Sequence, residues 1–139
     1  MEALGVAANI IAVVDISVKV LQVCSNYAKE VKHAEAEIKE LRQEVANLHD
    51  TATKVKTLIE GPQGAKLTAS QDFAHKVKEC LDVLTEADRK LQPSSERGFR
   101  RLGFKSLKWP FQSEDVHRTI GSINRCHNSL QLVLQVDGM

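Results

Sequence analysis

The sequence predicts an all-α protein, an antiparallel bundle of four or five helices in which the N-terminal helix is the most buried. Long stretches carry apolar residues in alternating steps of four and three, the period of helices that pack along one seam at a shallow crossing angle. No stretch shows the period-two alternation of a half-buried strand. At 139 residues the chain matches the ~100–200 residues of one domain. We therefore expect residues 1–139 to form a single helical domain.

The first expected helix is the most apolar one. No residue from Ala3 to Val14 is charged, and Asp15 and Lys19 then follow four apart, with the acid first, as favours a helix. The side chains along one face of this helix are small at its start and polar further on: Gly5, Ala8, Ala12, Asp15, Lys19 and Gln22.

A helix that is apolar on nearly all sides is either the centre of a bundle or a membrane segment. The charge-free run is shorter than the roughly 17–25 residues of a constitutive span, so we expect a core helix at rest. It should be about 30 residues long and end in a turn at 32–35. Because one of its ends is free, its release would yield a membrane-seeking segment.

The second and third helices show the clearest seams. The second is expected to end at Gly61-Pro62, since glycine and proline follow its last apolar position. Thr68 with Gln71 resembles a capping box for the third, and Ser70 is an alternative cap. The two seams are Ala34, Ile38, Leu41, Val45, Leu48, Ala52, Val55 and Ile59, then Phe73, Val77, Cys80, Leu84, Ala87 and Leu91.

The segment 97–111 differs in composition from the rest. It combines Arg97, Arg100, Arg101, Lys105 and Lys108 with Phe99, Phe104, Trp109 and Phe111. Its aromatics could plug the end of the bundle, the commonest role of such residues, or the segment could contact anionic lipid headgroups. Binding of single-stranded nucleic acid is the weakest interpretation because the net charge is only +1.

The last helix is expected to follow Ser113, which would cap it, with Glu114 and Asp115 in the first turn, where the helix dipole favours acids. Its predicted seam is Val116, Ile120, Ile123, His127, Leu130 and Leu134.

Composition gives two further expectations. Cys24, Cys80 and Cys126 are odd in number and widely spaced, which fits buried thiols in a reducing compartment better than a disulfide scaffold. The N-terminus carries Glu2 and lacks a basic region, so it does not resemble a secretory signal. We expect a cytoplasmic protein.

The sequence holds no motif of a known catalytic or metal site. The five histidines are scattered without metal-ligand spacing, and no phosphate-binding glycine loop or nucleophile elbow occurs. We therefore expect no enzyme activity, no cofactor and no metal site.

The opening residues Glu2 to Val14 resemble the start of the fungal HeLo-like domains, which stand at the N-terminus of STAND-type (NOD-like) receptors and related cell-death proteins. The stretch Glu37-Ile38-Lys39-Glu40-Leu41-Arg42 is similar to that family's second helix. Leu107-Lys108-Trp109-Pro110-Phe111, followed by a helix with an acidic start, is the most telling likeness. The resemblance covers nearly the whole chain.

The resemblance implies a membrane-targeting, pore-forming effector of programmed cell death in heterokaryon incompatibility and innate immunity. In that family a C-terminal sensor or amyloid-signalling region triggers homo-oligomerisation, and the first helix then enters the plasma membrane. The family's helix carries over onto Glu2 through Val23. The candidate insertion and oligomerisation residues are Glu2, Leu4, Gly5, Ala8, Ile11, Ala12, Asp15 and Lys19.

Other assignments come from our own reasoning on the residues. Candidate contacts to anionic lipid are Arg97, Arg100, Arg101, Lys105, Lys108 and Trp109. The small residues of the first helix could instead allow close approach to its neighbours in the core. The alternative function is a non-lytic helical module of signalling and oligomerisation, which would show an exposed apolar stripe on the second or third helix.

Overall fold

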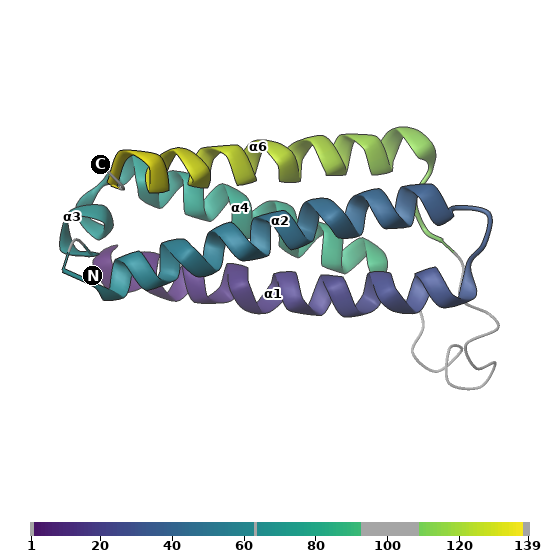
Figure 1. Ribbon diagram of the computed structural model, residues 1–139, viewed down its shortest axis with the longest axis horizontal. Coiled ribbons are helices and arrows are strands. Elements are labelled where there is room, and N and C mark those ends of the chain that lie inside the picture. The colour runs from purple at the N-terminus through teal and green to yellow at the C-terminus, as the bar shows by residue number, and fades with distance from the viewer. Residues whose placement is uncertain (1, 63, 93–108, 138–139) are drawn as a thin grey trace.

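The computed structural model describes residues 2–62, 64–92 and 109–137, and within these ranges the secondary structure is helical, without strands. The all-α prediction and the bundle-like packing are confirmed. The described helices, shown in Figure 1, are α1 (Glu2–Glu30), α2 (Glu35–Glu60), α3 (Gly64–Ala69), α4 (Gln71–Leu91) and α6 (Ser113–Asp137).

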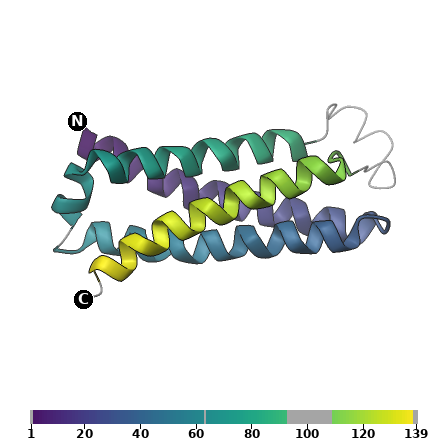
Figure 2. The ribbon, with the colours of Figure 1, turned by 90° about the horizontal axis from the view of Figure 1, so that it is seen from above.

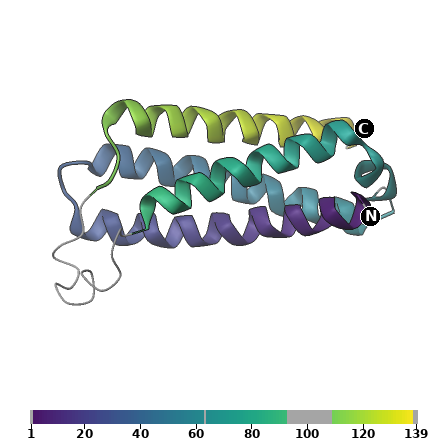
Figure 3. The ribbon, with the colours of Figure 1, turned by 180° about the vertical axis from the view of Figure 1, so that it is seen from behind.

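The four long helices lie side by side and form an elongated bundle (Figure 1). Helix α1 packs against α2 and α4, and α6 packs against the same two helices. The views in Figures 2 and 3 place the short α3 at one end of the bundle, near both chain termini. The turn between α1 and α2 lies at the opposite end, together with the segment that precedes α6.

The predicted seams of α2 and α4 form the centre of the core. Every predicted seam residue of these two helices is buried, apart from Ile59, which is half-buried. The turn after the first helix also falls where it was expected, because α1 ends at Glu30 and α2 begins at Glu35. The apolar period of the sequence thus identified which faces of these helices meet.

The expectation that α1 is the most buried helix is not confirmed, because seven described residues of α1 are buried and seven residues of α2 are buried as well. It occupies one corner of the bundle, with α2 and α4 as its neighbours. Although α1 is apolar on most sides, it buries only one stripe of its surface. Its buried residues follow a single line: Val6, Ile10, Val13, Ser17, Val20, Cys24 and Tyr27.

The helix starts differ in part from the predictions. Ser70, the alternative cap, is the N-cap of α4, and its hydroxyl accepts a hydrogen bond from the Phe73 N–H at 3.1 Å. The Thr68 hydroxyl instead donates to the Gly64 carbonyl, 3.0 Å away, within the unpredicted helix α3. Ser113 does not precede α6 as a cap but is its first residue.

The seam of α6 passes through Cys126 and not through His127. Cys126 is buried beside Ile123 and Leu130, whereas His127 is only half-buried. Both residues fit the spacing from Ile123, since three or four steps return to the same helix face. The prediction chose the wrong one of two neighbours.

Candidate functional site

The predicted insertion residues of α1 lie on the face that points away from the bundle. Gly5, Ala8, Ile11, Asp15 and Lys19 are exposed, and Ala12 is half-buried. Glu2 and Leu4 belong to α1, but their side chains lie outside the described part of the structure. The structure therefore brings the described members of this set together along one outer face.

Two of the three small residues of this face, Gly5 and Ala8, show no close packing within the bundle, whereas Ala12 is half-buried. A Cβ atom built on Gly5 would meet no other atom within 4 Å, and Ala8 is exposed. The interpretation that these two residues let neighbouring helices approach α1 is therefore wrong. Their small size remains available for contacts outside the bundle.

The outer face also carries large apolar side chains. Ile11 is 44% exposed and Val18 is 40% exposed. The sequence prediction included Ile11 but missed Val18. It could have been found from the helical spacing of seven residues from Ile11.

Within the described residues, α1 is long and apolar enough to cross a membrane, judged by length and composition. Only 28% of the residues in its most apolar stretch are buried. A core helix of a soluble protein meets the same length and composition test, but such a helix is mostly buried. Helix α1 therefore has the length and composition of a membrane span, although most residues of its apolar stretch are not buried in the bundle.

Two polar contacts add to the seam that holds α1. The Lys19 Nζ lies 3.4 Å from an Asp88 carboxylate oxygen of α4, and the Arg42 Nε of α2 donates to the Ser25 hydroxyl at 3.1 Å. Lys19 is exposed, and ion pairs of exposed lysines stabilise a protein by only about 0–1 kcal/mol. Burial of the seam therefore supplies most of the attachment of α1.

The seam ends in a buried tyrosine. The Tyr27 hydroxyl donates a 2.6 Å hydrogen bond to the Leu91 carbonyl, one of the last carbonyls of α4. Burial raises the pKa of Tyr27 to about 12, and burial likewise raises the pKa of Cys24 to about 12. Neither group is charged near neutral pH, so this part of the seam is an uncharged interface.

Trp109 closes the same end of the bundle. It is 9% exposed, and its ring packs edge-on against Tyr27, with the two centroids 5.3 Å apart. Phe111 is buried beside it at a centroid distance of 5.2 Å. The indole N–H is also bound, because it donates to the Glu37 carboxylate.

The proposed lipid contact of Trp109 is therefore wrong for this folded state, because the indole is core. The plug interpretation holds for Trp109 and Phe111. The remaining candidate lipid contacts, Arg97, Arg100, Arg101, Lys105 and Lys108, lie outside the described residues.

Comparisons with protein-family models, with curated proteins and with solved structures found no match to this chain. In the described ranges, no group of three or more histidine, cysteine or acidic side chains is arranged to hold a metal ion. The arguments for function therefore rest on α1 itself.

Proposed function

We propose that this chain is the membrane-targeting, pore-forming domain of a cell-death effector, with no enzymatic role. In this proposal the four long helices form an antiparallel bundle in the cytoplasm, and α1 leaves it on activation to enter the plasma membrane. The supporting observation is that α1 has the length and composition of a membrane span while less than a third of its apolar stretch is buried.

The outer face of α1 supports release of this helix more than of any other. Among the described residues, the large apolar side chains that are exposed are Ile11 and Val18 of α1 and Leu132 of α6. Once α1 separates, its seam would join Ile11 and Val18 in contact with water. Moving these side chains from water into a bilayer would then lower the free energy by about 25 cal/mol for each Å² of apolar surface removed from water.

The charges of Asp15 and Lys19 restrict how α1 can be arranged once it is inserted in a bilayer. A single charge at the bilayer centre costs at least about 2.5–3.5 kcal/mol, so such residues face water or a partner. We propose that several copies assemble with Asp15 and Lys19 along a wet lumen. Gly5, Ala8 and Ala12 lie on the same line and would let neighbouring helices approach closely, as small residues do in membranes.

The partners in this proposal are anionic lipids of the plasma membrane, further copies of the same chain and a C-terminal sensor or amyloid-signalling region outside this sequence. The basic residues of 97–108 are proposed as the lipid contacts, at about 1 kcal/mol for each cation near an anionic surface. The resemblance to the HeLo-like domains points in the same direction.

The alternative is a non-lytic signalling and oligomerisation module. Such a module was expected to expose an apolar stripe on its second or third long helix. The exposed large apolar residues of the described ranges are absent from α2 and α4, so the burial pattern favours the membrane proposal.

Leakage of dye from anionic vesicles tests the proposal, with the chain fused to an inducible oligomerisation tag. Ile11→Asp should abolish leakage, because it places an acid in the charge-free run from Ala3 to Val14 of the inserting helix. Leu132→Asp is the matched control, since Leu132 is 55% exposed on α6, and it should leave leakage unchanged. Both substitutions should leave the folded bundle intact, which circular dichroism can check.

Two results would contradict the proposal. The first is an absence of leakage from the unmodified chain at every degree of enforced oligomerisation. The second is equal loss of leakage in both variants. Sedimentation of a stable oligomer that ignores vesicles would instead establish the signalling module.

A further inference from the structure

Two of the three cysteines meet between α4 and α6. Cys80 of α4 and Cys126 of α6 are both buried in the shared core, and the two thiols lie close enough for each to shift the pKa of the other. Cys126 lines a pocket together with Glu79 and Val83, which flank Cys80 on α4. Cys24 lies on α1 and takes no part in this pair. The proposed membrane role of α1 uses neither Cys80 nor Cys126.

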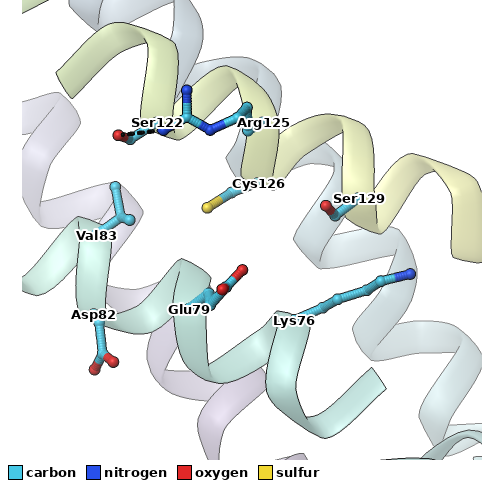
Figure 4. Close-up of a pocket in the computed structure, with 8 residues that line it drawn as sticks. All are labelled: Lys76, Glu79, Asp82, Val83, Ser122, Arg125, Cys126 and Ser129. Atoms are coloured by element: carbon cyan, nitrogen blue, oxygen red, sulfur yellow. Dashed lines mark hydrogen bonds between the residues drawn. The ribbon is translucent and has the colours of Figure 1, made fainter. Parts of the chain in front are cut away.

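A pocket of about 380 Å³ opens between α4 and α6 and reaches this pair. Figure 4 shows the Cys126 sulfur pointing from α6 into the pocket, toward Glu79 and Val83 of α4. The remaining charged groups on its walls are Lys76, Asp82 and Arg125. A small polar molecule can therefore reach one sulfur of the pair from solvent.

The two thiols differ in their surroundings. Cys126 is 6% exposed and lines the pocket, whereas Cys80 is fully buried and is not among the residues that line it. The interaction with Cys80 lowers the pKa of Cys126, and the same interaction together with burial raises the pKa of Cys80. Cys126 is thus the thiol that more readily becomes the nucleophilic thiolate.

We propose that Cys80 and Cys126 form a redox-active pair, in which Cys126 reacts with hydroperoxides that enter the pocket and Cys80 then closes a reversible disulfide between α4 and α6. The pair and the pocket that reaches it carry this proposal.

The chemistry balances with hydrogen peroxide as the oxidant. The Cys126 thiolate attacks one peroxide oxygen, the O–O bond breaks, and sulfenic acid and hydroxide form. The sulfur of Cys80 then attacks the sulfenic sulfur, forming the S–S bond and releasing the oxygen as water with the proton of the Cys80 thiol. In sum, two thiols and one peroxide give one disulfide and two waters. Thiol reductants reverse the product.

Helices α4 and α6 pack against each other, as a disulfide between them requires. A disulfide needs Cα atoms about 4.4–6.8 Å apart. Facing positions on packed helices approach this range, because the helix axes lie about 8–10 Å apart and each Cα stands about 2.3 Å from its axis. The disulfide would join α4 to α6 and leave α1 free, so it is independent of the proposed release of α1.

Peptide mapping after treatment with hydrogen peroxide tests the pair. Trypsin places the three cysteines on separate peptides, 20–29, 79–89 and 126–139. In non-reducing mass spectra we expect 79–89 joined to 126–139, lighter by two hydrogens than the two free peptides together. The cross-link should disappear on reduction, and 20–29 should keep its free thiol.

Two variants assign the roles of the cysteines. In Cys80→Ala, Cys126 should accumulate as sulfenic acid that a β-diketone probe traps. In Cys126→Ala, oxidation of Cys80 should slow at least about tenfold, because no thiol then lines the pocket. Cys24→Ala is the matched control and should cross-link like the unmodified chain.

The map of the unmodified chain decides the outcome even if a variant fails to fold. Disulfides only between chains, or equal oxidation of Cys24, would overturn the proposal.

Discussion

The indole N–H of Trp109 donates a hydrogen bond to one carboxylate oxygen of Glu37, 3.1 Å away, and the Ser113 hydroxyl donates to the other oxygen at 2.8 Å. Glu37 lies in the first turn of α2, and Ser113 begins α6. One carboxylate therefore fixes the segment before α6 against the start of α2.

Replacing Trp109 by phenylalanine should test this contact. Trp109→Phe keeps an aromatic ring in the core but removes the donor to Glu37. Because a hydrogen bond to a charged group stabilises by about 1.5–3 kcal/mol and Glu37 is only half-buried, we expect a loss of about 1–2 kcal/mol in urea unfolding followed by circular dichroism. Glu40→Gln, an exposed change on the same helix, should cost less than about 0.5 kcal/mol. Equal costs would contradict the contact.

The sequence predicted most of the fold for a physical reason. Apolar residues at a sustained helical period must share a face, so Leu41 and Leu48 of α2, or Val77 and Leu84 of α4, could be assigned to the core directly. The apolar period cannot tell which residue is in the core where two neighbouring residues both fit the helical spacing. Cys126 was missed for that reason.

The candidate site was only partly predictable. The line from Gly5 to Lys19 follows from helical spacing, but spacing cannot tell whether a line faces a neighbour or water, because that depends on which helices lie at each side. Trp109 shows the same limit. Its distant partners Tyr27 and Glu37 decide that it is core, and no local pattern reveals them.

The buried tyrosine predicts a pH dependence of stability. Burial raises the pKa of Tyr27 from 10.0 to about 12 in the folded state. Above pH 10 the unfolded chain loses this proton while the folded chain keeps it, so the folded state binds more protons and stability falls as pH rises. The fall should extend from about pH 10 to about pH 12.

Tyrosinate absorbance measures this shift directly, because Tyr27 is the one tyrosine of the chain. The folded protein should titrate near pH 12 and the urea-unfolded protein near pH 10. Tyr27→Phe should make the fall in stability above pH 10 less steep, with the part due to the buried thiols remaining. It should also cost about 0.5–1.5 kcal/mol at pH 8, since the bond to Leu91 is lost. Identical titrations in both states would contradict burial of the hydroxyl.

Two glycines should respond in opposite directions to alanine. A Cβ on Gly64 would lie 1.8 Å from the Ile59 carbonyl oxygen, so Gly64→Ala forces the backbone between α2 and α3 to shift and should cost about 1–3 kcal/mol. A Cβ on Gly5 would meet nothing within 4 Å. Gly5→Ala should therefore stabilise α1 by up to about 1 kcal/mol. Urea unfolding of both variants measures the difference, and a stabilised Gly64→Ala protein would contradict this turn geometry.

Neighbouring isoleucines of α1 should differ sharply in their contribution to stability. Ile10 is 1% exposed on the seam, whereas Ile11 is 44% exposed on the outer face. Ile10→Ala removes buried methyl groups and leaves a cavity, so it should lower the free energy of unfolding by about 2–5 kcal/mol. Ile11→Ala should change it by less than about 0.5 kcal/mol.

The Ile10→Ala and Ile11→Ala variants also distinguish the attachment of α1 to the bundle from its entry into the membrane. Ile10→Ala weakens the seam, so vesicle leakage should begin at a lower protein concentration. Ile11→Ala leaves the seam intact and removes apolar surface from the inserting helix, so its leakage should not begin at a lower concentration. Thr53→Ala, a substitution at an exposed position of α2, is the control variant and should leak like the unmodified chain. Hydrogen exchange of the α1 amides should accelerate in Ile10→Ala before that of α2. Uniform acceleration across the bundle would mean that α1 unfolds only together with the rest, and release of α1 alone would then fail.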